Sequence, residues 1–166
     1  MFPSNAPEDY ICPICLGIQK VENEKTLMKP TDIVYADNTV TVFVNSFFIG
    51  KNVGHVIVVP NTHYENIYDL APEVGRHIFD TAQRMANAIK EAYKTDGITI
   101  KQNNEPAGDQ HAFHYHLHVF PRYANDGFNE ILPEQKRLAE PGERAQYANK
   151  LRSYLEQVCR EIEDIS

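Results

Sequence analysis

The residues best suited to chemistry in this sequence are histidines gathered near position 115. Four of the seven histidines lie within eight residues, and three of them, His114, His116 and His118, alternate with aromatic and apolar residues. Alternate side chains of a β-strand lie on the same face of a sheet. The spacing therefore predicts a long strand over 112–122, with three imidazoles on one face and apolar side chains packed into a core on the other.

Two kinds of chemistry could use this row of imidazoles. A single metal ion bound by all three is disfavoured, because His114 and His118 lie ~13 Å apart along an extended strand and metal–nitrogen bonds are only ~2.1 Å long. The alternative is a division of labour, in which one histidine binds or orients, one attacks and one handles protons and phosphate. Neutral imidazole is nucleophilic near pH 7, so we expect attack on phosphorus followed by hydrolysis of the phospho-imidazole.

A second chemical feature is the pair Cys12 and Cys15, which are separated by two residues in a tight segment at 10–18. In a chain with no visible export signal, this spacing favours metal or redox chemistry over a disulfide scaffold. We expect structural zinc, which is usually bound by four ligands. A redox pair and two plain thiols are the alternatives that the spacing leaves open.

The elements that must position these groups follow from the period of the apolar residues. Alternating or β-branched runs predict strands, and recurrence at three- and four-residue steps predicts helices. The expected strands are 32–37, 39–44, 55–59, 97–102 and 112–122, the expected helices are 72–94 and 143–163, and 47–54 is expected to be a loop. Hairpins followed by a helix indicate an α+β fold, with one long helix packed on an antiparallel sheet and a C-terminal helix added.

Charge and hydropathy exclude several functions. Sixteen basic and 23 acidic residues give a formal net charge of −7, which disfavours general nucleic-acid binding because phosphate affinity needs a basic surface. No apolar run approaches the ~18 residues of a transmembrane helix, and the start of the sequence resembles no signal peptide. We therefore expect a cytoplasmic protein that binds neither nucleic acid in general nor a membrane.

Several stretches together resemble the histidine triad (HIT) superfamily over roughly residues 10–122. They are the alternating histidines at 114–120, the Gly-His strand and Pro-x-x-His turn at 54–63, the dipeptide Val44-Asn45, and Asn103 with Gln110. The resemblance implies a HIT domain at 1–122 and a homodimer. Residues 123–166 form a helical extension that is expected to pack on the same domain or on a dimer partner.

The resemblance also implies roles for individual residues. His116 is the implied nucleophile that carries a nucleoside-5′-phosphoryl group, and His118 is implied to bond the phosphoryl oxygens and assist the leaving group, with His114 as the third catalytic histidine. Asn103 and backbone N–H groups near Gln110 are implied to hold the phosphate, which needs directed dipoles rather than net charge. The candidates for contacts with the ribose and the base are Asn45, Phe43 and Val44.

The loop before the triad departs from the N-x-G-x-x-G-G-Q pattern of the family. Glu105 and Asp109 replace two of its glycines, and a carboxylate beside a phosphate repels it unless the carboxylate points away. His111 stands where many relatives have a small hydroxyl residue, and is either a second acid for the leaving group or a loop histidine. Asp109 and His111 are therefore included among the nucleotide-binding candidates.

Zinc-bearing branches of the superfamily are similar to this chain at the N-terminal cysteines. This similarity implies that His63 and His114 complete a structural zinc site with Cys12 and Cys15. The ion would tie the N-terminal segment to the catalytic strand and orient His114.

Taken together, the residues and the resemblance predict an enzyme that acts on nucleoside-5′-phosphoryl compounds through a nucleotidyl-histidine. The expected substrates are dinucleoside polyphosphates, adenosine phosphoramidates or adenylated molecules, and the expected ligand is a purine nucleotide. A hydrolase is favoured over a nucleotidyltransferase, because His118 stands where the uridylyltransferase branch has Gln. The alternatives are a non-catalytic nucleotide-binding or scaffold protein and a transition-metal protein that uses the histidine cluster.

Overall fold

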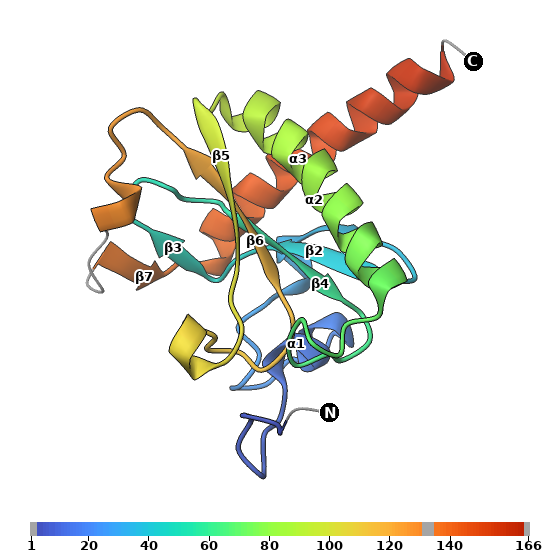
Figure 1. The fold of residues 1–166 in the computed structure, drawn as a ribbon. Helices are drawn as coiled ribbons and strands as arrows, with labels where there is room; N and C mark the ends of the chain where they lie inside the picture. The colour runs from blue at the N-terminus through green and yellow to red at the C-terminus, as the bar shows by residue number, and fades with distance from the viewer. Residues whose placement is uncertain (1–2, 131–134, 165–166) are drawn as a thin grey trace.

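The computed structural model describes residues 3–130 and 135–164, which form an α+β fold (Figure 1). In chain order, with η for 3-10 helices, the elements are α1 (Pro13–Ile18), η1 (Pro30–Asp32), β1 (Ile33–Ala36), β2 (Val40–Val44), β3 (Phe47–Ile49), β4 (Val56–Pro60), α2 (Pro72–Tyr93), β5 (Gly97–Gln102), η2 (Pro106–Gly108), β6 (Leu117–Arg122), η3 (Phe128–Glu130), β7 (Lys136–Leu138) and α3 (Pro141–Glu163). The fold class predicted from the sequence is confirmed, with an antiparallel sheet, a long helix and a C-terminal helix.

Five strands form the main sheet in the order β1-β2-β4-β6-β5, and every neighbouring pair is antiparallel. Every residue of β2 and β4 is buried, which suits their β-branched side chains. Helices α2 and α3 pack against each other and against this sheet, and Figure 1 shows them crossing beside one another. The main core between helices and sheet includes Val42, Val44, Val58, Leu117, Val119, Ile78, Met85, Ile89 and Leu151.

The opposite face of the sheet carries a continuous row of side chains. Cross-strand pairing places Ile33, Phe43, Ile57, His118 and Lys101 opposite one another across all five strands. Directly opposed residues of an antiparallel pair lie on the same face. The row therefore runs from apolar side chains through a histidine to a lysine. The apolar end of the row belongs to a second, smaller hydrophobic cluster, in which Ile14 and Met28 pack with Phe43, Ile57 and Val59.

A second sheet of two strands lies where the sequence predicts a loop. Strand β3 pairs with β7 in antiparallel fashion, with Ile49 opposite Lys136. A three-residue strand gives almost no periodic signal, and its partner comes from almost 90 residues further along the chain. The prediction of a loop over 47–54 is wrong at β3 because pairing between distant segments, and not local sequence, makes this strand.

The predicted strand over 112–122 begins only at Leu117. Strand β6 pairs with β4 through three residue pairs that end at Leu117. Before that point the backbone turns aside, because the N–H of His114 donates to the carbonyl of Ala112 at 2.9 Å and the N–H of Tyr115 donates to the carbonyl of Tyr64. The period-two spacing predicts that the three histidines share one face of a strand. This prediction is wrong for His114, which precedes β6 and turns away from it.

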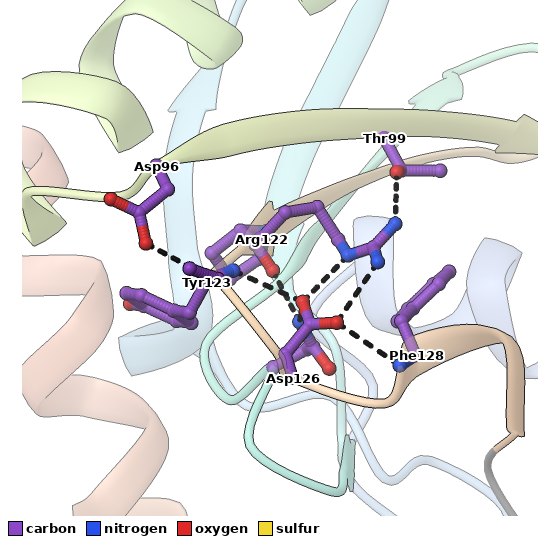
Figure 2. Close-up of polar contacts among 9 residues, drawn as sticks. Asp96, Thr99, Arg122, Tyr123, Asp126 and Phe128 are labelled. Carbon is purple, nitrogen blue, oxygen red and sulfur yellow. Dashed lines mark hydrogen bonds and ion pairs between the residues drawn. The ribbon is translucent and has the colours of Figure 1, made fainter.

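A compact turn after β6 is organised by the carboxylate of Asp126 (Figure 2). It accepts hydrogen bonds from the guanidinium of Arg122 at 2.7 and 2.9 Å, from the side chain of Asn52 at 2.7 Å, and from the backbone N–H groups of Tyr123 and Phe128. The hydrogen bonds from Arg122 are the main reason why the pKa of Asp126 lies well below its usual range. Burial acts in the opposite direction and raises this pKa.

Replacing this carboxylate is expected to destabilise the protein in a pH-dependent way. Asp126→Asn should lower the free energy of unfolding by about 2 kcal/mol at pH 7, because charged hydrogen bonds are lost. A carboxyl whose pKa is depressed by folding contributes its stability above the unfolded pKa of about 3.9 and loses it as the pH falls further. The difference from wild type in urea unfolding should therefore be constant from pH 7 to about pH 5 and shrink below about pH 4. Asp80→Asn, at an exposed position on α2, is the control, and an equal effect of both variants would contradict the prediction.

No helix in the described part of the chain is long and apolar enough to cross a membrane. The C-terminal helix α3, which is expected from the sequence to pack on its own domain or on a partner, contacts α2, η1, β1 and β2 of its own chain.

Candidate active site

A cavity of about 810 Å³ opens over the row that crosses the main sheet. Apolar side chains, three histidines, polar side chains and three lysines line it. Among them are Ile14, Leu27, Met28, Phe43, Ile57, His111, His116, His118, Asn45, Asn103, Asp109, Lys25, Lys101 and Lys136. A volume of this size is typical of small-molecule sites, and the mixture of apolar and polar walls suits a ligand with a flat apolar part and an anionic part.

His116 lines this cavity, and the residue is only 7% exposed. Its Nδ1 donates to the backbone carbonyl of His114 at 2.7 Å. That bond fixes the proton on Nδ1, so the lone pair of Nε2 is left for another partner. Burial lowers the pKa of His116, partly opposed by the bond to His114 and helped by the nearby His111. The ring is therefore neutral and oriented, as a nucleophile must be.

His118 lies beside His116 on the floor of the same cavity. The two ring centroids are 4.9 Å apart, and the His118 ring also stacks on Phe120 with a centroid distance of 5.3 Å. Burial, followed by the nearby rings of His116 and His55, lowers the pKa of His118 well below its usual value. Both rings therefore favour the neutral form and line the same cavity.

His114 does not face the cavity, although the sequence places it in the same row. Its ring is fully buried, Nε2 donates to the carbonyl of Pro60 at 2.9 Å, and Nδ1 lies 3.4 Å from the sulfur of Cys12. The backbone turn before β6 is the reason for this different direction. His114 contributes to the site through its carbonyl group, which orients His116.

Four side chains with metal-binding atoms lie close together at the N-terminal segment: Cys12, Cys15, His63 and His114. Their four ligand atoms all lie within 4.8 Å of one another, and three sulfur-to-Nδ1 distances are 3.4, 3.4 and 3.5 Å. Tetrahedral zinc with Zn–S bonds of about 2.3 Å and Zn–N bonds of about 2.05 Å requires separations of about 3.5 Å between sulfur and nitrogen. The four side chains therefore fit a zinc ion. The hydrogen bond from His114 to Pro60 also fixes the ring for ligation through Nδ1.

The loop before the triad has positive φ angles at the two positions where Glu105 and Asp109 replace glycines of the family pattern. Glu105 has φ 61° and Asp109 has φ 65°, in the left-handed region that favours glycine. The side-chain amide of Asn103 donates to the carbonyl of Asp109 at 3.1 Å, and the side-chain oxygen of Gln110 accepts from the N–H of Glu105 at 2.7 Å. Asp109 and His111 both line the cavity, whereas Gln110 is buried and holds the loop closed.

The ribose and base candidates divide into two groups. Phe43 and Asn45 line the cavity. Val44 is fully buried in the main core on the helix side of the sheet, because neighbouring residues of a strand point to opposite faces. The prediction that the side chain of Val44 contacts the nucleotide is therefore wrong.

Sequence reasoning missed several residues of the site, and His55 and Lys136 are the two polar ones that matter most for its chemistry. His55 is fully buried, accepts from the amide of Asn45 at 2.7 Å through Nε2, and stacks on Phe120 at 4.2 Å. Its position in the Gly-His strand was a usable signal, since a polar ring in a buried strand needs a partner. Lys136 lines the cavity from β7, and no local pattern in the sequence indicates this.

The fold and this cavity, with the imidazoles of His116 and His118 beside apolar side chains, define a protein of the histidine-triad class. Residues 26–125, more than half of the chain, match the family model described as the HIT domain. The chain therefore belongs to the HIT family.

Known members agree with this assignment. "Protein hit" of Bacillus subtilis (strain 168) is 35% identical over 103 residues, which are 61% of this chain and 70% of that protein. The bis(5′-adenosyl)-triphosphatase of Saccharomyces cerevisiae (strain YJM789) is 32% identical over 80 residues, 48% of this chain and 39% of the yeast protein. The crystal structure of a zinc-bound histidine triad family protein from Mycobacterium smegmatis is 26% identical with a TM-score of 0.71, and the match covers 90% of this chain and 96% of that one.

Proposed function

We propose that this protein is a hydrolase of nucleoside-5′-phosphoryl compounds that works through a covalent nucleotidyl group on His116. The observation that carries the proposal is the bond of 2.7 Å from His116 Nδ1 to the carbonyl of His114, in a ring that faces the cavity. It leaves the Nε2 lone pair as the attacking group. The similarity to a relative named bis(5′-adenosyl)-triphosphatase supports the reaction class.

The reaction divides into two displacements at phosphorus. The Nε2 lone pair of His116 forms a bond to phosphorus while the bond from phosphorus to the leaving group breaks, and its electron pair departs with the leaving group. Water then forms a new oxygen–phosphorus bond as the nitrogen–phosphorus bond breaks, and a water proton is released. His118 holds the non-bridging oxygens during both steps, and Asn103 borders the cavity as a further neutral donor.

The nucleoside is placed by the apolar end of the cavity. Phe43 and Ile57 belong to the row on the sheet face, and Ile14 and Met28 pack over them. Such a wall suits the flat face of a purine base. Asn45, whose amide is held by His55, is positioned to bond the ribose hydroxyls.

The proposal is tested by a turnover screen with adenosine phosphoramidate, dinucleoside polyphosphates and nucleotide sugars. We expect hydrolysis of at least one of the first two classes. After acid-free quenching, a peptide that contains His116 should gain the mass of one nucleotidyl group, which is a nucleoside monophosphate less one water. A protein that binds these compounds without turnover and without the adduct would instead be a nucleotide-binding or scaffold protein. Transfer to an added nucleophile in preference to water would indicate a nucleotidyltransferase.

We also propose that zinc occupies the cluster of Cys12, Cys15, His63 and His114 as a structural ion, which the similarity to the zinc-bound mycobacterial protein supports. The ion would cross-link α1 to the segment before β6. It would thereby hold the carbonyl of His114 in place under His116.

Removal of one zinc ligand is expected to remove the ion and loosen the fold. Cys12→Ser should lose about one zinc per chain by metal analysis and lower the free energy of unfolding by at least about 3 kcal/mol, because metal binding is coupled to folding. Cys159→Ser, on the exposed part of α3, is the matched control and should keep the ion. Metal that remains in Cys12→Ser but leaves in His116→Ala would show that the histidines of the cavity bind it instead.

A further inference from the structure

Lysines of the cavity have no part in the chemistry described above. Lys25, Lys101 and Lys136 line it, against one acidic residue, Asp109, among the described residues of the wall. The whole chain carries a net charge of −7, so this local excess of positive charge opposes the general trend of the protein. Charges that border a cavity with apolar walls act more strongly on a bound ion than charges in open solvent.

The row across the main sheet gives the cavity a direction. Phe43 and Ile57 lie at its apolar end, His118 follows, and Lys101 on β5 is directly opposite His118. Neighbouring strands are about 4.8 Å apart, so the backbone of Lys101 lies one strand beyond that of His118. A nucleoside that occupies the apolar end leaves the Lys101 end for the other substituent on phosphorus.

Lys136 approaches the same region from the two-stranded sheet. It is opposite Ile49 in the pairing of β3 with β7, and its ammonium lies 4.8 Å from the centroid of the Phe47 ring. Phe47 and Ile49 also line the cavity, so this face of the small sheet forms a wall with Lys136 on it. After burial and the rings of His116 and His55, the charges of Lys101 and Lys136 also lower the pKa of His118, which places both ammonium groups within electrostatic reach of that ring.

Lys101 is not neutralised by its neighbour. Its ammonium is 3.9 Å from the carboxylate of Asp109, and the two side chains are 49% and 75% exposed. An exposed pair at that distance is weak. The ammonium can therefore turn to an anion that enters the cavity, and Lys136 has only the aromatic face of Phe47 as a described partner.

We propose that Lys101 and Lys136 form a subsite for the leaving group and select substrates whose leaving group is itself anionic, such as a second phosphate. This inference rests on the proposed function and specifies its substrate class. When the bond from phosphorus to a bridging oxygen breaks, the electron pair stays on the leaving phosphate, and two ammonium groups stabilise that added charge. An amine leaving group needs a proton at the same moment and gains nothing from fixed positive charge.

The inference is tested with two substrates that share the transferred nucleotide. In the first displacement, diadenosine triphosphate releases ADP, whereas adenosine phosphoramidate releases ammonia. We expect Lys101→Ala and Lys136→Ala each to lower kcat/KM for the triphosphate by about tenfold, and for the phosphoramidate by about threefold or less, so that the ratio of the two constants shifts. Lys136→Arg should restore most of the ratio because it keeps the charge. Lys150→Ala, at an exposed position on α3, should leave the ratio as in wild type.

Binding measurements separate failure of this inference from failure of the proposed function. By calorimetry, wild-type protein should bind ADP more tightly than AMP, and the two Lys→Ala variants should lose that preference by about tenfold, whether or not turnover occurs. Wild-type protein that prefers ADP but hydrolyses neither substrate would overturn the hydrolase and leave the anion subsite standing. Equal loss on both substrates, or an unchanged preference for ADP in both variants, would overturn the subsite while the hydrolase stands.

Discussion

His116→Ala is expected to lose at least about 10³-fold in kcat on any substrate that the wild-type protein hydrolyses. The imidazole is the only partner that the proposed reaction offers to phosphorus in its first step, and removal of a nucleophile leaves only the catalysis supplied by binding and orientation. Affinity for AMP should change by about threefold or less, because the base wall, Asn45 and Asn103 are untouched. Steady-state kinetics and calorimetry measure the two quantities.

The matched control for this variant is His77→Ala. His77 lies on α2 and pairs with Asp37 at 2.7 Å, away from the cavity, so turnover should stay at the wild-type rate. A second test uses His116→Gly with added imidazole, which should restore part of the lost rate if a neutral ring is what the cavity lacks. Turnover near the wild-type rate in both His116 variants without added imidazole would exclude the covalent mechanism.

Local sequence predicted structure correctly where the alternation of polar and apolar residues within one strand decides which face each side chain takes. The alternation of Leu117, His118 and Val119 correctly predicts a strand with an apolar face toward the main core. The same reasoning failed three residues earlier, because the direction of His114 is decided by contacts with Pro60 and Cys12. Those partners lie 54 and 102 positions away, and a period-two pattern contains no information about them.

The loop before the triad, residues 103–110, shows the opposite relation between pattern and structure. The replacement of two glycines by Glu105 and Asp109 suggests a different path for the loop. The backbone nevertheless keeps positive φ angles at both positions, at a cost of about 1 kcal/mol or more each for residues with a side chain. The closing bonds of Gln110, which donates to the carbonyls of Glu65 and Ala112, compensate for this strain. They could not be inferred from composition.

Lys136 illustrates what sequence alone could not supply. It belongs to a strand of three residues in the extension after the triad, and it reaches the cavity only because β7 pairs with β3. The extension also contributes Arg144, whose side chain is buried although Arg is among the residues least often buried. Both cases depend on contacts between distant segments.

Arg144 holds the N-terminal wall of the cavity from the C-terminal helix. Its guanidinium donates to Asp32 at 2.9 Å, to the carbonyl of Leu27 at 2.9 Å and to the carbonyl of Ala139. The side chains of Arg144 and Asp32 are 2% and 0% exposed. Asp32 also accepts from the backbone N–H of Lys29, and Leu27 lines the cavity. This ion pair therefore connects α3 to the segment that lines the apolar end of the cavity.

Arg144→Met is expected to lower the free energy of unfolding by about 3–5 kcal/mol, because a buried carboxylate is left without its counter-charge. Urea unfolding measures this loss, and Arg160→Met, at an exposed position near the end of the same helix, should cost about 0.5 kcal/mol or less. The double variant Asp32→Leu with Arg144→Met should be more stable than Arg144→Met alone, since no unpaired charge remains.

If Arg144→Met folds at 20 °C, KM for the nucleotide substrate should rise while kcat changes little, because the wall at Leu27 loosens and His116 keeps its bond to His114. A loss of stability below about 1 kcal/mol, or a fall in kcat with KM unchanged, would show that this ion pair does not support the wall of the cavity at Leu27.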